Sequence, residues 1–296
     1  MHDHHHHDHD HAEHALGVAL WLNLAFLVIE AGAAWWTGSL ALLSDAVHMV
    51  SDVGGLVVAT LAASIAHRAA DHRATFGWAR AGIVGAGLNG LTLLAAAAWI
   101  VWAAVERLLA GPPPLPGWPM LAVGAAGLAV NLGAAWRLWA ADQHDLNIRA
   151  ALLHMLTDAL GSVGAMVAAV AVLYGYPAAD PAVSVLIAAL VGWGAVHVLR
   201  ASGRVLLQLA PPDFDVPALD RALRQLDGVR DVHALRVWSL DGHAPVVSAH
   251  LVSEGEPDAV RRAAEAVAHA AGAHDVTLQV EAAGSGCLHA HREAPC

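Results

Sequence analysis

The chain has 296 residues, of which 57% are hydrophobic and only 14% are charged. A soluble domain carries nearer a quarter charged residues, so this composition points to a membrane protein. The formal charge is −11 with neutral histidines, and every basic residue is an arginine, which excludes the basic face that a nucleic-acid-binding protein needs. The two cysteines, Cys287 and Cys296, cannot build a disulfide framework and lack zinc-finger spacing.

The first fifteen residues are dominated by histidine mixed with aspartate and glutamate. No basic segment followed by a cleavable apolar core is present, so residues 1–15 are not expected to act as a signal peptide. We interpret them as a His-rich cytoplasmic tail that chelates metal ions. The alternative is a solvated acidic leader without function.

Six apolar stretches follow, each near or above the roughly 20 residues that a membrane-spanning helix requires. They predict six transmembrane helices in a domain over residues 16–205. The predicted spans are Leu16–Trp36, Leu40–Ala66, Arg80–Leu108, Trp118–Trp139, Asn147–Leu173 and Pro181–Leu199.

Arginine placement predicts the orientation of these spans. The second break contains Arg68 and Arg73, and the fourth is flanked by Arg137 and Arg149, whereas the first and fifth contain no arginine. Positively charged loops stay in the cytoplasm, so the even-numbered breaks and both termini are predicted to be cytoplasmic.

A soluble domain is predicted over residues 206–282, followed by a flexible C-terminal tail over 283–296. Its predicted elements are a helix, two strands, a helix and a strand, over 216–226, 232–240, 246–252, 257–271 and 276–280. This α-β-β-α-β order is typical of a ferredoxin-like α+β domain. The predicted fold class is therefore an all-α bundle of six transmembrane helices plus a C-terminal cytoplasmic ferredoxin-like α+β domain.

Two pairs of ionisable residues interrupt the apolar stretches. His48 and Asp52 lie in the second span, His154 and Asp158 lie in the fifth, and each pair is four residues apart. On a helix this spacing places both side chains on one face. Because ionisable groups are costly within a membrane, the two pairs predict a functional site rather than structural groups that satisfy one another.

The chemistry of the four side chains favours a transition-metal ion. Two imidazoles and two carboxylates suit tetrahedral Zn²⁺, and cobalt, nickel or cadmium also fit. The absence of thiolates argues against Cu⁺, and the imidazoles argue against Mg²⁺ or Ca²⁺. Zinc binds neutral histidine and ionised aspartate, so protons compete with the metal for the same atoms. We therefore hypothesise an exchange of Zn²⁺ for H⁺.

Several separated motifs, in the same order, resemble the cation diffusion facilitator family of zinc transporters over nearly the whole chain. They are residues 38–48 (GSLALLSDAVH), 76–80 (FGWAR), 146–154 (LNIRAALLH), 180–181 (DP), 232–238 (VHALRVW) and 276–281 (VTLQVE). The resemblance implies six spans, a cytosolic metallochaperone-like domain, a homodimer and metal/proton antiport. It also implies that His48, Asp52, His154 and Asp158 form the transport site.

The resemblance further implies a regulatory zinc site in the soluble domain. His233, His250 and His274 are its expected ligands, and Asp275, Cys287, His289 and His291 are candidates to complete it. Three unrelated surface histidines are the alternative. A metal site that some relatives carry after the second span is not expected here, because Ala74 and Trp78 stand where imidazoles would be needed.

Three further polar residues lie within the predicted spans. Glu30 and Asn131 are expected to line the ion path or to bond across helices. Asp45 precedes His48 by almost one turn and is a candidate to orient that ligand.

The leading hypothesis is a secondary transporter of a bacterial inner membrane that exports Zn²⁺ in exchange for protons. The alternative is a membrane-anchored metal sensor or buffer without transport. An intramembrane metalloenzyme would need an open coordination position and a general base, so no enzymatic activity is expected. The sequence has no P-loop, so no nucleotide is expected to drive transport.

Overall fold

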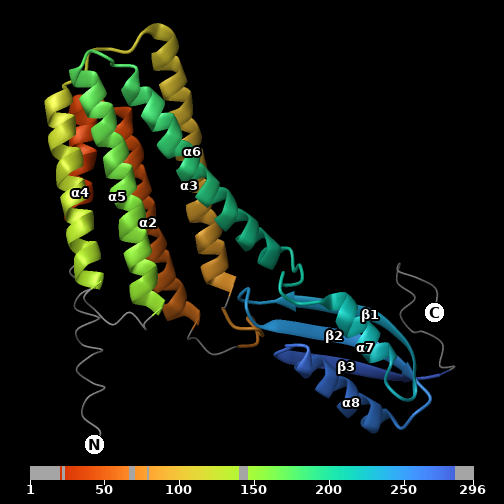
Figure 1. The fold of residues 1–296 in the computed structure, drawn as a ribbon. Coiled ribbons are helices and arrows are strands. Elements are labelled where there is room, and N and C mark those ends of the chain that lie inside the picture. The colour runs from red at the N-terminus through yellow and green to blue at the C-terminus, as the bar shows by residue number, and fades with distance from the viewer. Residues whose placement is uncertain (1–20, 22–23, 67–70, 79, 140–145, 284–296) are drawn as a thin grey trace, which may run out of the picture. The chain divides into compact units, whose positions relative to one another are not determined.

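The computed structural model describes residues 21, 24–66, 71–78, 80–139 and 146–283, shown as coloured ribbons in Figure 1. By its internal contacts the chain divides into two units. The first comprises residues 1–57 and 88–197, and the second comprises residues 58–87 and 198–296. The two units are described separately below.

The N-terminal part of the chain is helical. An apolar helix over Leu24–Thr37 is followed by five longer helices: α2 (Leu40–Ala66), α3 (Arg80–Ala110), α4 (Gly117–Trp139), α5 (Leu146–Leu173) and α6 (Ala179–Leu206). Within the described residues, four stretches are long and apolar enough to cross a membrane: Arg80–Ala110, Gly117–Arg137, Met155–Leu173 and Ala179–Leu206.

Each predicted span coincides with a helix, although the first predicted span begins outside the described residues. The last helix, α6, continues to Leu206 rather than ending near Leu199. No proline intervenes before Pro211, so the chain contains no strong helix breaker at the predicted end.

Glycines in the first unit allow helices to pack closely. Helices α4 and α5 contact each other along their length and lie side by side in Figure 1. A Cβ atom at Gly124 would lie 2.8 Å from Met166 Cγ, and one at Gly117 would lie 2.7 Å from Leu173 Cγ. Small residues at such positions let helix backbones approach in a membrane, where no hydrophobic effect drives helices together.

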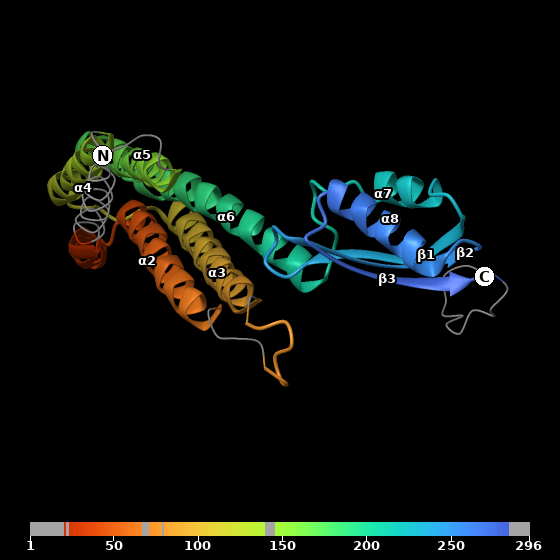
Figure 2. The same cartoon turned by 90° about the horizontal axis from the view of Figure 1, so that it is seen from below.

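The second unit contains the C-terminal α+β domain. Its elements are α7 (Val216–Arg224), β1 (Val229–Ser239), β2 (Pro245–Ser253), α8 (Pro257–Ala270) and β3 (Asp275–Ala282). The sheet order is β1-β2-β3, with β1 antiparallel and β3 parallel to β2. Figure 2 shows α7 and α8 on the same face of the sheet. The predicted α-β-β-α-β order is confirmed.

Local sequence signals explain the two short helices. Asp215 and Glu256 cap α7 and α8 by accepting backbone hydrogen bonds, and a proline stands in the first turn of each helix. The apolar faces of the helices pack against alternate residues of the central strand, such as Val247 and Leu251. Intervening residues of β2, including His250, therefore lie on the sheet face opposite the two helices.

Candidate metal centres

Two helices bring three of the four predicted transport-site residues together. Helix α2 carries His48 and Asp52 one turn apart, and α5 carries Asp158. His48 Nε2 lies 3.5 Å from Asp158 Oδ1 and 3.9 Å from Asp52 Oδ2. One ligand atom from each of the three residues lies within 4.8 Å of the other two.

The fourth predicted ligand, His154, lies on α5 one turn before Asp158. Its side chain is outside the described residues, so its part in the site stays a prediction.

The three described side chains fit a transition-metal ion. In a tetrahedral zinc site with bonds of about 2.1 Å, neighbouring ligand atoms are roughly 3.4 Å apart. The measured separations of 3.5 and 3.9 Å are close to this spacing. Asp158 is only 3% exposed, whereas His48 and Asp52 are 25% and 30% exposed. The cluster therefore has a buried side on α5 and a more accessible side on α2.

Helix α3 contacts α2 next to the cluster of His48, Asp52 and Asp158. Asn89 on α3 donates a hydrogen bond from Nδ2 to the backbone oxygen of Ser51, which immediately precedes Asp52. Gly54 and Gly55 leave room for the Asn89 side chain, because a Cβ at either glycine would lie within 3.4 Å of it. This contact fixes the segment of α2 that presents Asp52.

The other polar residues predicted at membrane depth are also buried. Glu30, Asp45 and Asn131 are each at most 3% exposed. Asp45 interacts electrostatically with both His48 and Asp158. Its proposed role in orienting His48 remains a prediction.

A second cluster lies on the helix-free face of the C-terminal sheet. His233 on β1 is directly opposite His250 on β2, and their ring centroids are 5.2 Å apart. Glu281 on β3 lies 2.8 Å from His250 Nδ1 and 3.8 Å from His233 Nε2. These three residues again offer ligand atoms within 4.8 Å of one another, with two nitrogen donors and one oxygen donor that suit zinc.

The third predicted ligand of this site, His274, is elsewhere on the domain. Its backbone N–H donates to Pro245 O at the start of β2, and its side chain is exposed. Asp275, the residue after His274, pairs with Val246 on β2. Val246 is four residues, or about 13 Å, from His250 along that strand, so His274 is distant from His250. The structure brings Glu281 to the two histidines in place of His274. Cys287, His289 and His291 lie outside the described residues.

Glu281 was not among the predicted ligands, although one signal was available. Thr277, Gln279 and Glu281 share one face of β3, because they alternate along the strand with Val276, Leu278 and Val280, which pack on the core. That alternation places Glu281 on the face that also carries His250. The register between β2 and β3, which the sequence does not specify, then brings their side chains together.

A β-bulge adjoins the second cluster. The pairing register shifts between His233 and Arg236, and Ala234 has a φ of 50°, an unusual left-handed value for a residue with a side chain. The extra residue allows Val232 and Val237 both to face the core despite their odd spacing. The bulge lies directly after His233, which is still in register with His250.

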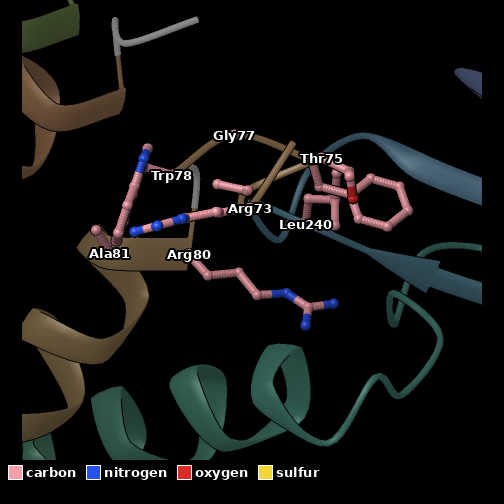
Figure 3. A pocket seen from close by; sticks show the side chains of 9 residues that line it. Arg73, Thr75, Gly77, Trp78, Arg80, Ala81 and Leu240 are labelled. Carbon is pink, nitrogen blue, oxygen red and sulfur yellow. The ribbon is translucent and has the colours of Figure 1, made fainter. Parts of the chain in front are cut away.

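The loop after α2 does not form a metal cluster in the part of the chain that the structure describes. Asp71 instead accepts hydrogen bonds from the backbone N–H groups of Ala74 and Arg73, which lower the pKa of its carboxyl group. Figure 3 shows the adjacent cavity of about 260 Å³, lined by Arg73, Trp78 and Arg80 among others. Arginine side chains carry a positive charge and offer no acceptor atom to a metal cation.

Comparison with known proteins identifies the family of this chain. Residues 16–207 match the cation efflux transmembrane domain, and residues 211–283 match the cation efflux protein cytoplasmic domain. The chain belongs to the cation efflux family. It is thus a transporter with a membrane-spanning helical domain and a cytoplasmic α+β domain, and it is not an enzyme.

Curated bacterial relatives align over most of the chain. The zinc transporter ZitB of Escherichia coli is 38% identical over 236 residues, which cover 79% of this chain and 75% of that protein. The cadmium, cobalt and zinc/H(+)-K(+) antiporter of Bacillus velezensis is 36% identical over 266 residues, covering 87% and 85%. The cation efflux system protein CzcD of an Alcaligenes strain is 33% identical over 243 residues, covering 82% and 77%.

Proposed function

We propose that this protein exports Zn²⁺ from the cytoplasm of a bacterium in exchange for protons, by alternating the access of one site across the inner membrane. The observation that carries the proposal is the convergence of His48, Asp52 and Asp158 from two apolar helices. His154, one turn from Asp158 on α5, is the proposed fourth ligand.

The ligand set supports zinc and related ions as cargo. Imidazole and carboxylate donors suit Zn²⁺, Co²⁺ and Cd²⁺ better than Mg²⁺ or Ca²⁺. The Bacillus velezensis relative is named for the same three metals, and the Escherichia coli relative is named a zinc transporter. Two ionised aspartates would also balance the charge of a divalent ion in a low-dielectric interior.

Proton coupling follows from the same atoms. Zn²⁺ binds deprotonated imidazole and carboxylate, so a proton and a metal ion cannot occupy one ligand together. A site that loads metal on the cytoplasmic side and protons on the other side exchanges the two ions. The membrane-embedded ligands are thus proposed to carry both cargo and counter-ion.

The cytoplasmic cluster is proposed to bind regulatory zinc. His233, His250 and Glu281 supply three ligands, and a water molecule or a second subunit could supply the fourth. Family resemblance favours a homodimer, in which zinc bound to this domain would bias the carrier between its states. His274 is not part of this proposed ligand set, because it lies at the far end of β2.

Zinc-sensitive bacterial cells test export directly. Cells that lack their own zinc exporters should grow in elevated zinc when they express the chain, and their total zinc content should fall. The Asp158→Asn variant should lose both effects. Rescue accompanied by unchanged or higher cellular zinc would instead support the alternative, a membrane-anchored metal sensor or buffer.

A further inference from the structure

A buried carboxyl pair lies close to the transport site but outside its proposed ligand set. Glu30, on the helix Leu24–Thr37, is 0% exposed, and its carboxyl group interacts with that of Asp45 on α2. Neither carboxyl oxygen of Glu30 receives a hydrogen bond from any residue that the structure describes. Asp45 is itself only 3% exposed.

A buried carboxyl pair is stable only if the two groups share a proton or hold a cation between them. A carboxylate cannot donate a hydrogen bond to another carboxylate, and leaving a charged group buried without compensation costs several kcal/mol. Asp158 adds further negative charge near both residues. The imidazole of His48 interacts electrostatically with Asp45. Arg107 on α3 does not balance this pair, because its guanidinium group lies 3.8 Å from Asp180.

A third buried oxygen belongs to the same group. Ser162 on α5 is 1% exposed, and its hydroxyl group interacts with the carboxyl group of Asp45. Gly161 lets α5 approach α2, since a Cβ there would lie 2.5 Å from Asp45 Oδ1. The three oxygen-bearing side chains therefore come from three different helices.

We propose that Glu30, Asp45 and Ser162 form a second cation site, which the exported divalent ion visits after it leaves the transport site. This inference rests on the proposed function. Asp45 precedes His48 by three residues and Ser162 follows Asp158 by four, so the second site lies about one helical turn from the first. Two carboxylates balance the charge of one divalent ion.

The position of the second site suits export. Asp45 lies closer than Asp52 to the start of α2, and the other end of this helix leads into the arginine-containing break predicted to be cytoplasmic. An ion entering from the cytoplasm would meet the transport site first. An oxygen-only site holds Zn²⁺ less tightly than one with imidazoles, so the ion could pass outward and be released.

Equilibrium zinc binding to the full-length protein in detergent tests the proposal. All variants should carry His250→Ala and lack residues 2–14, so that neither the cytoplasmic cluster nor the His-rich tail obscures the count. Glu30→Gln and Asp45→Asn should each lose one weakly bound Zn²⁺ per chain and keep the tightly bound ion. The matched control is Glu106→Gln, which removes an exposed carboxylate from α3 and should change neither ion.

The two variants separate this proposal from simpler explanations. Glutamine imitates a protonated glutamate, so Glu30→Gln with undiminished zinc binding would show that the pair only shares a proton and would overturn the site. Retention of the tight ion shows that each variant is folded. Asp158→Asn should lose the tight ion instead, and failure of that result would count against the transport site rather than against the second site.

Discussion

The carboxylate of Asp180 accepts a hydrogen bond of 2.9 Å from the backbone N–H of Leu40, although 140 positions separate the two residues. Asp180 also accepts hydrogen bonds from the Ser39 hydroxyl and the Ala41 N–H, and Arg107 lies 3.8 Å away. The first turn of α2 is therefore capped by a residue from the start of α6. Since α2 carries His48 and Asp52, this cap fixes the helix that presents two of the proposed ligands.

Replacing this cap should destabilise the helical unit. Asp180→Asn removes the negative charge and part of the acceptor capacity at a fully buried position, and each lost hydrogen bond to a charged group costs about 1.5–3 kcal/mol. Thermal unfolding of the detergent-purified protein should show a lower midpoint. Glu106→Gln, at an exposed position on α3, should leave the midpoint unchanged, and an equal loss in both variants would refute the capping role.

The close contact at Gly161 predicts a selective glycine effect. Gly161→Ala would place a methyl group 2.5 Å from Asp45 Oδ1, so α2 and α5 must separate or Asp45 must move, at a cost of about 1–3 kcal/mol. Zinc transport and the unfolding midpoint should both fall. Gly133→Ala on α4 is the control, because a Cβ there has open space. Normal transport by Gly161→Ala would contradict the described packing.

The cytoplasmic cluster makes a prediction that distinguishes two histidines. His233→Ala should remove one bound Zn²⁺ per chain, because it deletes one of three clustered ligands. His274→Ala should bind as much zinc as the parent, because His274 is remote from the cluster. Elemental analysis after dialysis of the full-length protein measures both. Loss of zinc from His274→Ala as well as from His233→Ala would favour the ligand set expected from sequence.

Metal selectivity should depend on the imidazole of His48. His48→Asp replaces nitrogen with oxygen, which weakens preference for Zn²⁺ and favours harder ions such as Mn²⁺. The ratio of Mn²⁺ to Zn²⁺ transport should rise by about tenfold or more, equivalent to roughly 1.4 kcal/mol. Competition between the two metals in sealed vesicles provides the measurement. An unchanged ratio would argue that His48 does not contact the cargo.

Much of the fold could be predicted from periodicity and composition. The apolar stretches correspond to the observed helices, and the α-β-β-α-β order of the cytoplasmic domain follows from local signals such as the prolines in the first turns of α7 and α8. The i,i+4 spacing also placed His48 beside Asp52 correctly, because a helix enforces that proximity.

Contacts that depend on tertiary register could not be predicted in the same way. The sequence marks Glu30 as polar at depth, but only the packing of its helix against α2 brings it to Asp45. Likewise, the parallel register pairs His250 with Gln279, so that Glu281, two residues further along the same face of β3, reaches His250 while His274 does not. In both cases the decisive information is the relative displacement of two elements, which local patterns do not encode.

The most direct test of the account is simultaneous measurement of zinc and proton movement in sealed proteoliposomes whose cytoplasmic face points outward. With an acidic lumen, the parent should take up Zn²⁺ and release protons, Asp158→Asn should do neither, and His274→Ala should match the parent. Zinc uptake that persists in Asp158→Asn, or that proceeds without proton release, would contradict a transport site built on His48, Asp52 and Asp158.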